Sequence, residues 1–512
     1  MLSTSSILLV IICSYFLLLL FISFYTARGS NNESFFVGNK SSHWALVAFG
    51  MIGTSLSGMT FISVPGTVST QGFAYFQVVI GYWIGYFIVA FVLLPIYYRM
   101  NLTSIYTYLE ERLGRNAHKT GAGFFILSRT VGATLRLYLV IKVLEDFILD
   151  DFNIGFELTA IIILGLILLY TFKGGVKTIV WTDTLQTTFM LLALIICLFY
   201  LAGSFDMNIF QSWKEVQLKG LTKTFETDYL SGSFFLKQII GGAFITIAMT
   251  GLDQEMMQKN ISVSRLKDSQ KNMMVMGTLQ MIVVFIFLFL GSMLFLYAEA
   301  HQINVPGDDL FPTIAISSGL PFFITICFII GLISALFPSA DGAMTALTSS
   351  FCIDILGMNK KGNWSEKKKT NIRLMVHVSF AFIFLGFVFF FRVVDNGSLI
   401  DILLKLAGFT YGPLLGLFAF GILTKRKIKE GWAFPISISA FVLTFILDLW
   451  NNFQWYQDKL NFSDKTWIWI EEMNQMAWGS YKIGVELLIL NAIITMLLLR
   501  VASQPKKYNT LK

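Results

Sequence analysis

The chain has 512 residues, of which 55% are hydrophobic and only 13% are charged. A compact water-soluble core cannot bury this many Phe, Leu and Ile side chains, so the composition excludes an ordinary soluble domain and indicates a polytopic membrane protein. The net charge of +7 requires no nucleic-acid partner, because the distribution of Lys and Arg between loops explains it.

Apolar segments long enough to cross about 30 Å of hydrocarbon as helices recur along the chain. The first lacks a basic leader and a clear cleavage site, so it is interpreted as a membrane helix rather than a signal peptide. The sequence predicts thirteen such helices, which cover 5–25, 43–70, 76–98, 119–148, 157–173, 179–203, 233–256, 273–300, 320–355, 372–394, 398–423, 431–450 and 478–502.

Basic residues gather in alternate connections. The loops after predicted helices 1, 3, 5, 7, 9 and 11, together with the C-terminal tail, hold about 26 Lys and Arg residues, against about six on the other side. Since basic loops stay cytoplasmic, we expect the N-terminus outside and the C-terminus inside. The expected location is the plasma membrane, with multiple passes, or the cell inner membrane in a Gram-negative bacterium.

The sequence GTSLSGMTFISVPG at 53–66 interrupts predicted helix 2. An irregular backbone survives at membrane depth only where it faces protein or a wet cavity. Gly53 and Gly58 permit local unwinding, Pro65 removes a backbone donor, and carbonyls freed in this way are able to bind a cation. Close packing of small residues between helices is the alternative. Hydroxyl groups around the expected break come from Ser55, Ser57 and Thr60.

Predicted helix 7 repeats this pattern in IIGGAFITIAMTGLDQ, where Gly241, Gly242 and Gly251 interrupt an apolar run. Glycine-broken helices at matching positions in two halves point to an inverted-repeat transporter. We expect a first helix and loop at 1–42, five-helix repeats at 43–203 and 233–423, and two additional helices with a cytoplasmic tail at 424–512.

Three charged residues stand out among those inside predicted membrane helices: Arg136 in helix 4, Asp183 in helix 6 and Asp341 in helix 9. A charge at this depth costs at least about 2.5 kcal/mol, so each is expected to face a cavity or a partner. For Asp183 the alternative is an interfacial position, and for Asp341 it is a buried structural pair. Arg136 has the alternative role of neutralising one of the aspartates.

Other classes of site find little support. The four cysteines and four histidines are scattered without the spacing of a zinc site, a disulfide framework or a catalytic triad. No G-x-x-x-x-G-K-[ST] sequence is present to bind the phosphates of ATP. An energy source for transport would therefore be an ion gradient.

Three segments resemble the sodium:solute symporters: GGVKTIVWTDTLQ at 174–186, GLDQEMMQKNISVSRLKDSQK at 251–271 and LAGFTYGPLLGLFAFGILTKR at 406–426. The resemblance extends from about residue 35 to 430. It implies an all-α polytopic membrane protein with a LeuT-type fold of two inverted five-helix repeats. It also implies transport of a small solute with Na⁺, one or two ions per cycle.

The resemblance assigns a sodium site between the break in helix 2 and helix 9. Its ligands would be the carbonyls of Gly53, Leu56 and Ala335 and the hydroxyl of Ser339. The family often has a hydroxyl residue where this chain has Pro338, so one ligand is missing. A second ion in some members binds the aspartate that matches Asp183, and its partners here would be Asp341 and Gly342. A carboxylate at that place binds either sodium or a proton.

The same resemblance places the solute near the two helix breaks. The run TSLSGMT resembles the segment through which sialic acid symporters offer hydroxyls, here Ser55, Ser57 and Thr60. Arg136 matches the position that holds the substrate carboxylate, and a planar guanidinium suits a carboxylate because two parallel hydrogen bonds form. Phe61 and Tyr75 are candidates for stacking on a solute ring, with core or lipid packing as the alternative.

The sequence thus predicts a sodium-coupled symporter, with an acidic sugar such as sialic acid as the first candidate solute and a neutral sugar or another nutrient as the alternative. Its expected partners are the solute, sodium ions and the bilayer, with no nucleic acid and no obligate protein partner. An ion channel or sensor, or a membrane enzyme that uses Asp183 and Asp341 as acid and base, are the other classes considered. We do not expect an enzyme.

Overall fold

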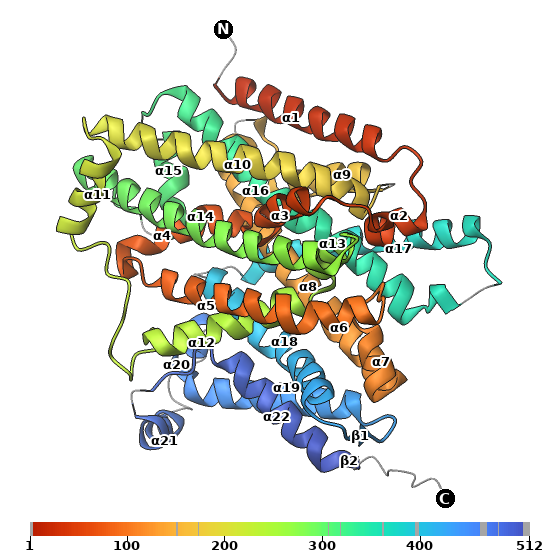
Figure 1. Ribbon diagram of the computed structural model, residues 1–512. Helices are drawn as coiled ribbons and strands as arrows, with labels where there is room; N and C mark the ends of the chain where they lie inside the picture. Colours follow the sequence, from red (N-terminus) through yellow and green to blue (C-terminus); the bar gives the residue numbers. More distant parts are fainter. Residues whose placement is uncertain are drawn as a thin grey trace, which may run out of the picture.

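The computed structural model describes residues 4–149, 152–172, 174–305, 307–317, 319–360, 363–394, 399–460, 468–479 and 481–504. Over this part of the chain the protein is helical apart from two short strands (Figure 1). The helices up to residue 218 are α1 (Thr4–Thr26), α2 (Asn32–Val37), η1 (Gly38–Lys40), α3 (Trp44–Ser55), α4 (Gly58–Gln71), α5 (Tyr75–Ile88), η2 (Val89–Leu93), α6 (Leu94–Arg99), α7 (Thr107–Leu113), α8 (Arg115–Leu144), η3 (Glu145–Leu149), α9 (Phe156–Thr171), α10 (Val176–Ser204) and α11 (Ile209–Leu218).

The rest of the chain continues the same pattern. Its strands β1 (Lys427–Ile428) and β2 (Ser503–Gln504) pair in antiparallel fashion, so the segment directly after α22 lies beside the loop after α18. Its helices are α12 (Phe235–Thr246), η5 (Ile247–Gly251), α13 (Gln254–Ile261), α14 (Leu266–Ala300), η6 (Gly307–Asp309), α15 (Leu310–Ser317), α16 (Phe322–Ser350), η7 (Phe351–Ile355), η8 (Met358–Lys360), α17 (Glu366–Val394), α18 (Leu399–Leu423), α19 (Ala433–Asn451), α20 (Phe453–Leu460), α21 (Ile468–Trp478) and α22 (Leu487–Ala502).

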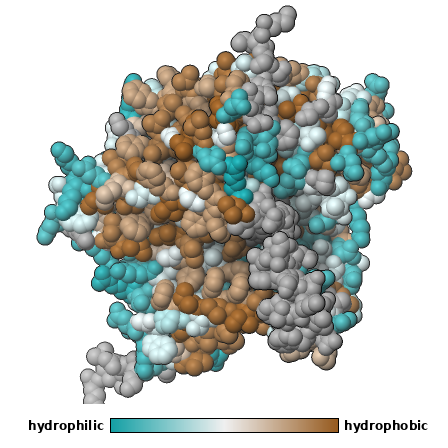
Figure 2. Space-filling model, turned by 180° about the vertical axis from the view of Figure 1, so that it is seen from behind, coloured by the Kyte–Doolittle hydropathy of each residue, from teal (hydrophilic) through white to brown (hydrophobic). Residues whose placement is uncertain are grey.

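Long apolar helices dominate the molecule. In the described residues nine helices have the length and composition of a membrane span, and two bent helix pairs raise the number to eleven. The shorter apolar helices α9 and α22 lie in predicted helices 5 and 13. Figure 2 shows a broad hydrophobic surface between hydrophilic margins. The total of thirteen spans and the orientation of the termini stay predictions.

Both predicted helix breaks exist, but Pro65 and Gly242 do not form them. The bend between α3 and α4 is 55° and falls at Leu56 (φ −91°, ψ 80°) and Ser57. Pro65 lies inside α4, well past the break. Inside α4 this proline removes the hydrogen bond that its N–H would make to the Phe61 carbonyl, so any distortion it causes lies within α4 and not at the break.

The second bend, of 65°, separates α12 with η5 from α13. Its position is set by Asp253, whose side chain accepts hydrogen bonds from the N–H groups of Glu255 and Met256 and so starts a new helix. Gly242 lies within α12 and faces Gly81 of α5, where a side chain would collide with the backbone. This glycine therefore serves helix packing rather than unwinding.

The core is centred on α16, in which every residue from Gly331 to Ser350 is buried. The break between α3 and α4, the helices α8 and α10 and the half-helix α13 all pack against it. By contrast α1 lies at one edge of the molecule (Figure 1) and exposes Leu17, Phe21 and Phe24. The two broken helices thus meet in the interior.

Candidate ion and solute site

The break between α3 and α4 lies directly against α10 and α16. The Gly53 N–H donates to Thr187 Oγ1 at 3.1 Å, and a Cβ atom on Gly53 would stand 3.5 Å from Pro338 Cγ. A Cβ atom on Gly58 would stand 3.7 Å from the Leu336 Cα atom. A Cβ atom would collide with Thr187 Oγ1 at Gly53 and would stand 2.6 Å from Val140 Cγ2 at Gly58, so glycine at these two positions permits the close approach of the neighbouring helices.

Oxygen atoms suited to sodium gather at this contact. The helical ladder of α3 ends when the Leu56 N–H donates to the Ile52 carbonyl at 2.8 Å, and no described backbone N–H donates to the Gly53 carbonyl. In α16, Pro338 has no N–H for the Ser334 carbonyl. The Ser339 hydroxyl donates to the Leu336 carbonyl at 2.8 Å, which leaves its oxygen lone pairs available. Carbonyls left free at a helix break are ligands of the kind that bind Na⁺ in transporters with discontinuous helices.

A cavity of about 90 Å³ lies beside the same break. Arg136 projects into it and is 9% exposed. Nine of its twelve lining residues are polar. The lining consists of Thr54, Ser55, Tyr82, Tyr86, Arg129, Arg136, Ile245, Thr246, Met249, Thr250, Met256 and Gln280.

Arg136 makes no ion pair with a described residue, and its Nε atom is buried without a hydrogen-bond partner. It therefore does not neutralise Asp183 or Asp341. A buried guanidinium with unused donors facing a polar cavity is suited to bind an anion from outside the protein.

Of the other predicted solute residues, some line the cavity that holds Arg136 and some do not. Ser55 lines the cavity with Arg136, whereas Ser57 is the buried N-cap residue of α4 and Thr60 lies in its first turn, both outside the lining. Phe61 is fully buried among Phe287, Phe311 and Phe328, with ring centroids 5.3–5.9 Å apart. Core packing, the alternative reading of this ring, accounts for its position.

Tyr75 lies between two cavities. It lines a second cavity of about 310 Å³ formed by α4, α5, α12 and the C-terminal helices. Its hydroxyl is 3.5 Å from the hydroxyl of Tyr82, which lines the cavity that holds Arg136. This pair of tyrosines therefore stands between the larger cavity and the predicted solute residues.

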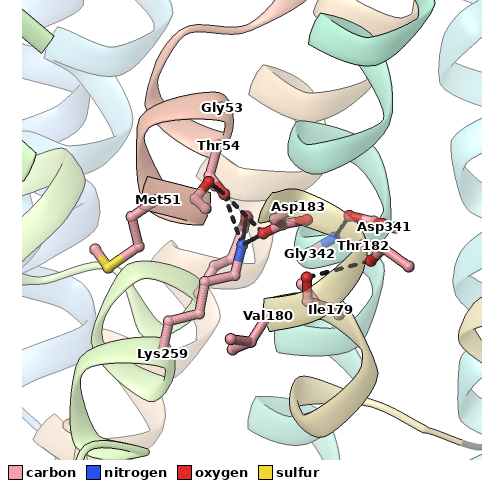
Figure 3. A network of polar contacts seen from close by, with 12 residues as sticks. Met51, Gly53, Thr54, Ile179, Val180, Thr182, Asp183, Lys259, Asp341 and Gly342 are labelled. Carbon is pink, nitrogen blue, oxygen red and sulfur yellow. Dashed lines mark hydrogen bonds and ion pairs between the residues drawn. The ribbon is translucent and has the colours of Figure 1, made fainter. Parts of the chain in front are cut away.

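Asp183 is paired with a lysine. Lys259 Nζ of α13 is 2.7 Å from Asp183 Oδ2 and donates to Thr54 Oγ1 at 2.7 Å (Figure 3). The Thr54 hydroxyl in turn donates to Asp183 Oδ2 at 3.1 Å. Lys259 and Asp183 are each 1% exposed, so this ion pair joins α10 to α13 in the protein interior.

The N-terminus of α13 carries further charges. Arg129 of α8 forms an ion pair with Glu255 and lies 3.7 Å from Asp253 Oδ2. The same Asp253 oxygen accepts a hydrogen bond of 2.8 Å from the Tyr411 hydroxyl. An acidic residue at a helix N-terminus is stabilised by the free N–H groups there.

Asp341 faces different partners. Its Oδ2 atom accepts from the Tyr170 hydroxyl at 2.7 Å and its Oδ1 atom from the Gly342 N–H at 2.5 Å. No described cation lies within ion-pair distance of it. Asp183 and Asp341 thus lie near one another between α10 and α16 (Figure 3), with separate sets of hydrogen bonds.

Sequence reasoning missed the charged residues of α13. Lys259 was counted as a basic residue of the loop after helix 7, but it is buried inside the second half of the broken helix. The available signal was the helical i, i+4 spacing of Glu255 and Lys259, preceded by Asp253, directly after an apolar run. Arg129 gave a similar signal, because it is a second arginine two helical turns before Arg136 in the same predicted membrane helix.

Comparison with known proteins places these residues in a family. The sequence profile of the sodium:solute symporter family matches residues 35–437. A sodium/sialic acid symporter of Aliivibrio fischeri is 26% identical over 79% of this chain and 80% of the relative. One of Proteus mirabilis is 26% identical over 79% and 82%. Sodium-coupled monocarboxylate transporter 1 of Mus musculus is 24% identical over 84% and 70%.

A solved structure shares the same architecture. A substrate-bound, outward-open, Na⁺-coupled sialic acid symporter superposes with a TM-score of 0.78, covering 97% of each chain at 18% identity. At this identity the likeness establishes the fold, and it confirms the predicted LeuT-type class of membrane transporter.

Proposed function

Because this chain belongs to the sodium:solute symporter family, we propose that it carries an acidic sugar of the sialic acid type across the membrane together with sodium. Two of the relatives are sodium/sialic acid symporters. In this proposal the protein moves its solute chemically unchanged and is not an enzyme.

The observation that carries the proposal is the unpaired guanidinium of Arg136 in a polar cavity. Its free donors match a carboxylate, to which they offer two parallel charge-assisted hydrogen bonds. The hydroxyl of Ser55 and the side chains of Thr250 and Gln280 supply further polar contacts for sugar hydroxyls. A buried, uncompensated charge is costly, so its presence indicates a ligand that neutralises it.

Sodium would bind where α3 ends against α16. The proposed repeats at 43–203 and 233–423 contribute the two broken helices, and the carbonyls of Gly53, Leu56 and Ala335 with the Ser339 hydroxyl would hold the ion. Binding there orders the break beside Ser55, so sodium and solute each raise the affinity for the other. Rocking of one bundle against the other then exposes the site to the opposite side. One inward charge gains about 2.3 kcal/mol per 100 mV of membrane potential.

A small monocarboxylate is the second candidate solute. Arg136 would bind its carboxylate in the same way, and the murine monocarboxylate transporter is among the relatives. The polar lining of the cavity favours the sugar, because a short alkyl chain would leave these hydroxyl and amide groups without partners.

The proposal is tested by uptake into proteoliposomes that carry an inward sodium gradient and a negative interior. Four solutes are compared: N-acetylneuraminic acid, its methyl ester, neutral N-acetylmannosamine and lactate. We expect saturable, sodium-dependent uptake of the acid and none of the matched ester. Preference for lactate would assign the second candidate, uptake of the ester or the neutral sugar would refute the carboxylate role of Arg136, and non-saturating sodium current would indicate a channel.

A further inference from the structure

We propose that Lys259 is a tethered cation that takes the place of a second sodium ion at Asp183, so that this protein binds one sodium ion per transport cycle. The inference rests on the sodium coupling of the proposed function but not on the choice of solute. It concerns the two residues that the sequence left open as sodium or proton ligands, Asp183 and Asp341.

The ammonium group of Lys259 already has the surroundings of a bound monovalent cation. Its three N–H donors face three oxygen atoms, from Asp183 at 2.7 Å, Thr54 at 2.7 Å and Glu255 at 3.5 Å. These oxygens come from α10, α3 and α13, and Figure 3 shows the side chain reaching across to Asp183 and Thr54. With 1% exposure, the ammonium has exchanged its water shell for protein oxygens.

A second cation beside the same carboxylate would lie next to the Lys259 ammonium. The negative charge of Asp183 is balanced by Lys259, and a sodium ion at this place would be repelled by the ammonium. Asp341 has both oxygens hydrogen-bonded by neutral donors, the Tyr170 hydroxyl and the Gly342 N–H. Gly342 has no side chain, so it lacks the oxygen ligand that a hydroxyl residue at this position would provide.

One atom of the carboxylate remains open. Asp183 Oδ1 is buried without a hydrogen-bond partner, whereas Oδ2 is shared by Lys259 and Thr54. A second sodium ion held by Asp183 would therefore bind through Oδ1. Replacing this carboxylate by an amide is the decisive perturbation, because it removes the anionic ligand while keeping the shape of the side chain.

The experiment counts sodium ions directly, without solute, by equilibrium binding of ²²Na⁺ to the purified full-length protein, alongside sodium titration of its thermal stability. We expect one ion per wild-type chain and a Hill coefficient near one. Lys259→Met leaves Asp183 without a counter-charge and is expected to bind two ions. Lys259→Met combined with Asp183→Asn should return to one ion, as should Lys259→Arg. Lys267→Met, an exposed lysine on the next helix, is the control.

Two ions on the wild-type chain would overturn the inference, and so would loss of an ion in the double variant. If Lys259→Met does not fold, Lys259→Gln, which keeps a hydrogen-bonding side chain without the charge, takes its place: two ions support the proposal, and one ion overturns it. A merely structural Lys259 would change thermal stability but not the number of ions. Absence of any sodium binding would refute the sodium coupling itself, whereas a count of two leaves the proposed function intact.

Discussion

Replacing Arg136 by alanine should weaken solute binding while strengthening the fold. In the absence of solute the guanidinium is buried and makes no ion pair with a described residue. Such a charge lowers stability because no partner offsets the hydration free energy that it loses on burial. Truncation removes this cost, so we expect the melting temperature of the solute-free protein to rise.

The loss of affinity follows from the number of bonds. A hydrogen bond between charged groups contributes about 1.5–3 kcal/mol, so a bidentate contact with a carboxylate contributes roughly 3 kcal/mol or more. Since about 1.4 kcal/mol is a factor of ten, Arg136→Ala should raise the dissociation constant about a hundredfold. Arg136→Lys keeps the charge but only one such bond, and about tenfold is expected.

The assay measures thermal shift and isothermal binding of N-acetylneuraminic acid in saturating sodium. Arg115→Ala is the matched control, because it removes an exposed arginine from the first turn of the same helix. Should Arg136→Ala bind the acid within about twofold of wild type, or lose stability without solute, the assignment of Arg136 as the carboxylate receptor is wrong.

Three further predictions concern packing, sodium and pH. Gly81→Ala places a methyl group against the Ile239 carbonyl of α12 and should cost about 1–3 kcal/mol in unfolding measurements, unlike Gly165→Ala, which has open space. Pro338→Ser adds a hydroxyl beside Gly53 and should tighten sodium binding about three- to tenfold; unchanged sodium titration would contradict the site. The hydrogen bond from Lys360 lowers the pKa of Glu110 below its ordinary 4.5. The ionised carboxylate therefore stabilises the fold above pH 4.5, and this stabilisation is lost as the pH falls through the lowered pKa. Glu110→Gln should make the melting temperature depend less on pH between about pH 3 and 5, and an acid profile identical to that of the wild type would refute this.

The sequence predicted the membrane class, most helices and the existence of two interrupted helices because each rests on local pattern. Hydropathy over about 20 residues reports a span directly. The positions of the breaks were predicted less well. Glycines suggested unwinding at Gly241 and Gly242, but Gly241 packs against Val485 and Gly242 against α5, and the bend is set by the Asp253 cap. Composition alone does not separate these two uses of glycine.

The partners of the buried charges were beyond prediction. Whether Asp183 meets a sodium ion, Asp341 or Lys259 depends on how α10 and α13 cross, and these segments are 76 residues apart at the contact. Arg136 was identified from its charge inside a predicted membrane helix and from the family resemblance, and its lack of an ion pair became visible only when the surrounding helices were in place. The ligand set of the sodium site and the solute contacts stay predictions.

The two halves of the second broken helix contact their neighbours through different kinds of interaction, and we expect them to move differently during transport. All eight residues of α13 are buried, and ion pairs or hydrogen bonds tie its first turns to α8, α10 and α18. Contact between α12 and α5 depends instead on small residues such as Gly81 and Gly242. We therefore expect Leu252, where the two halves join, to act as a hinge about which α12 moves while α13 stays in place.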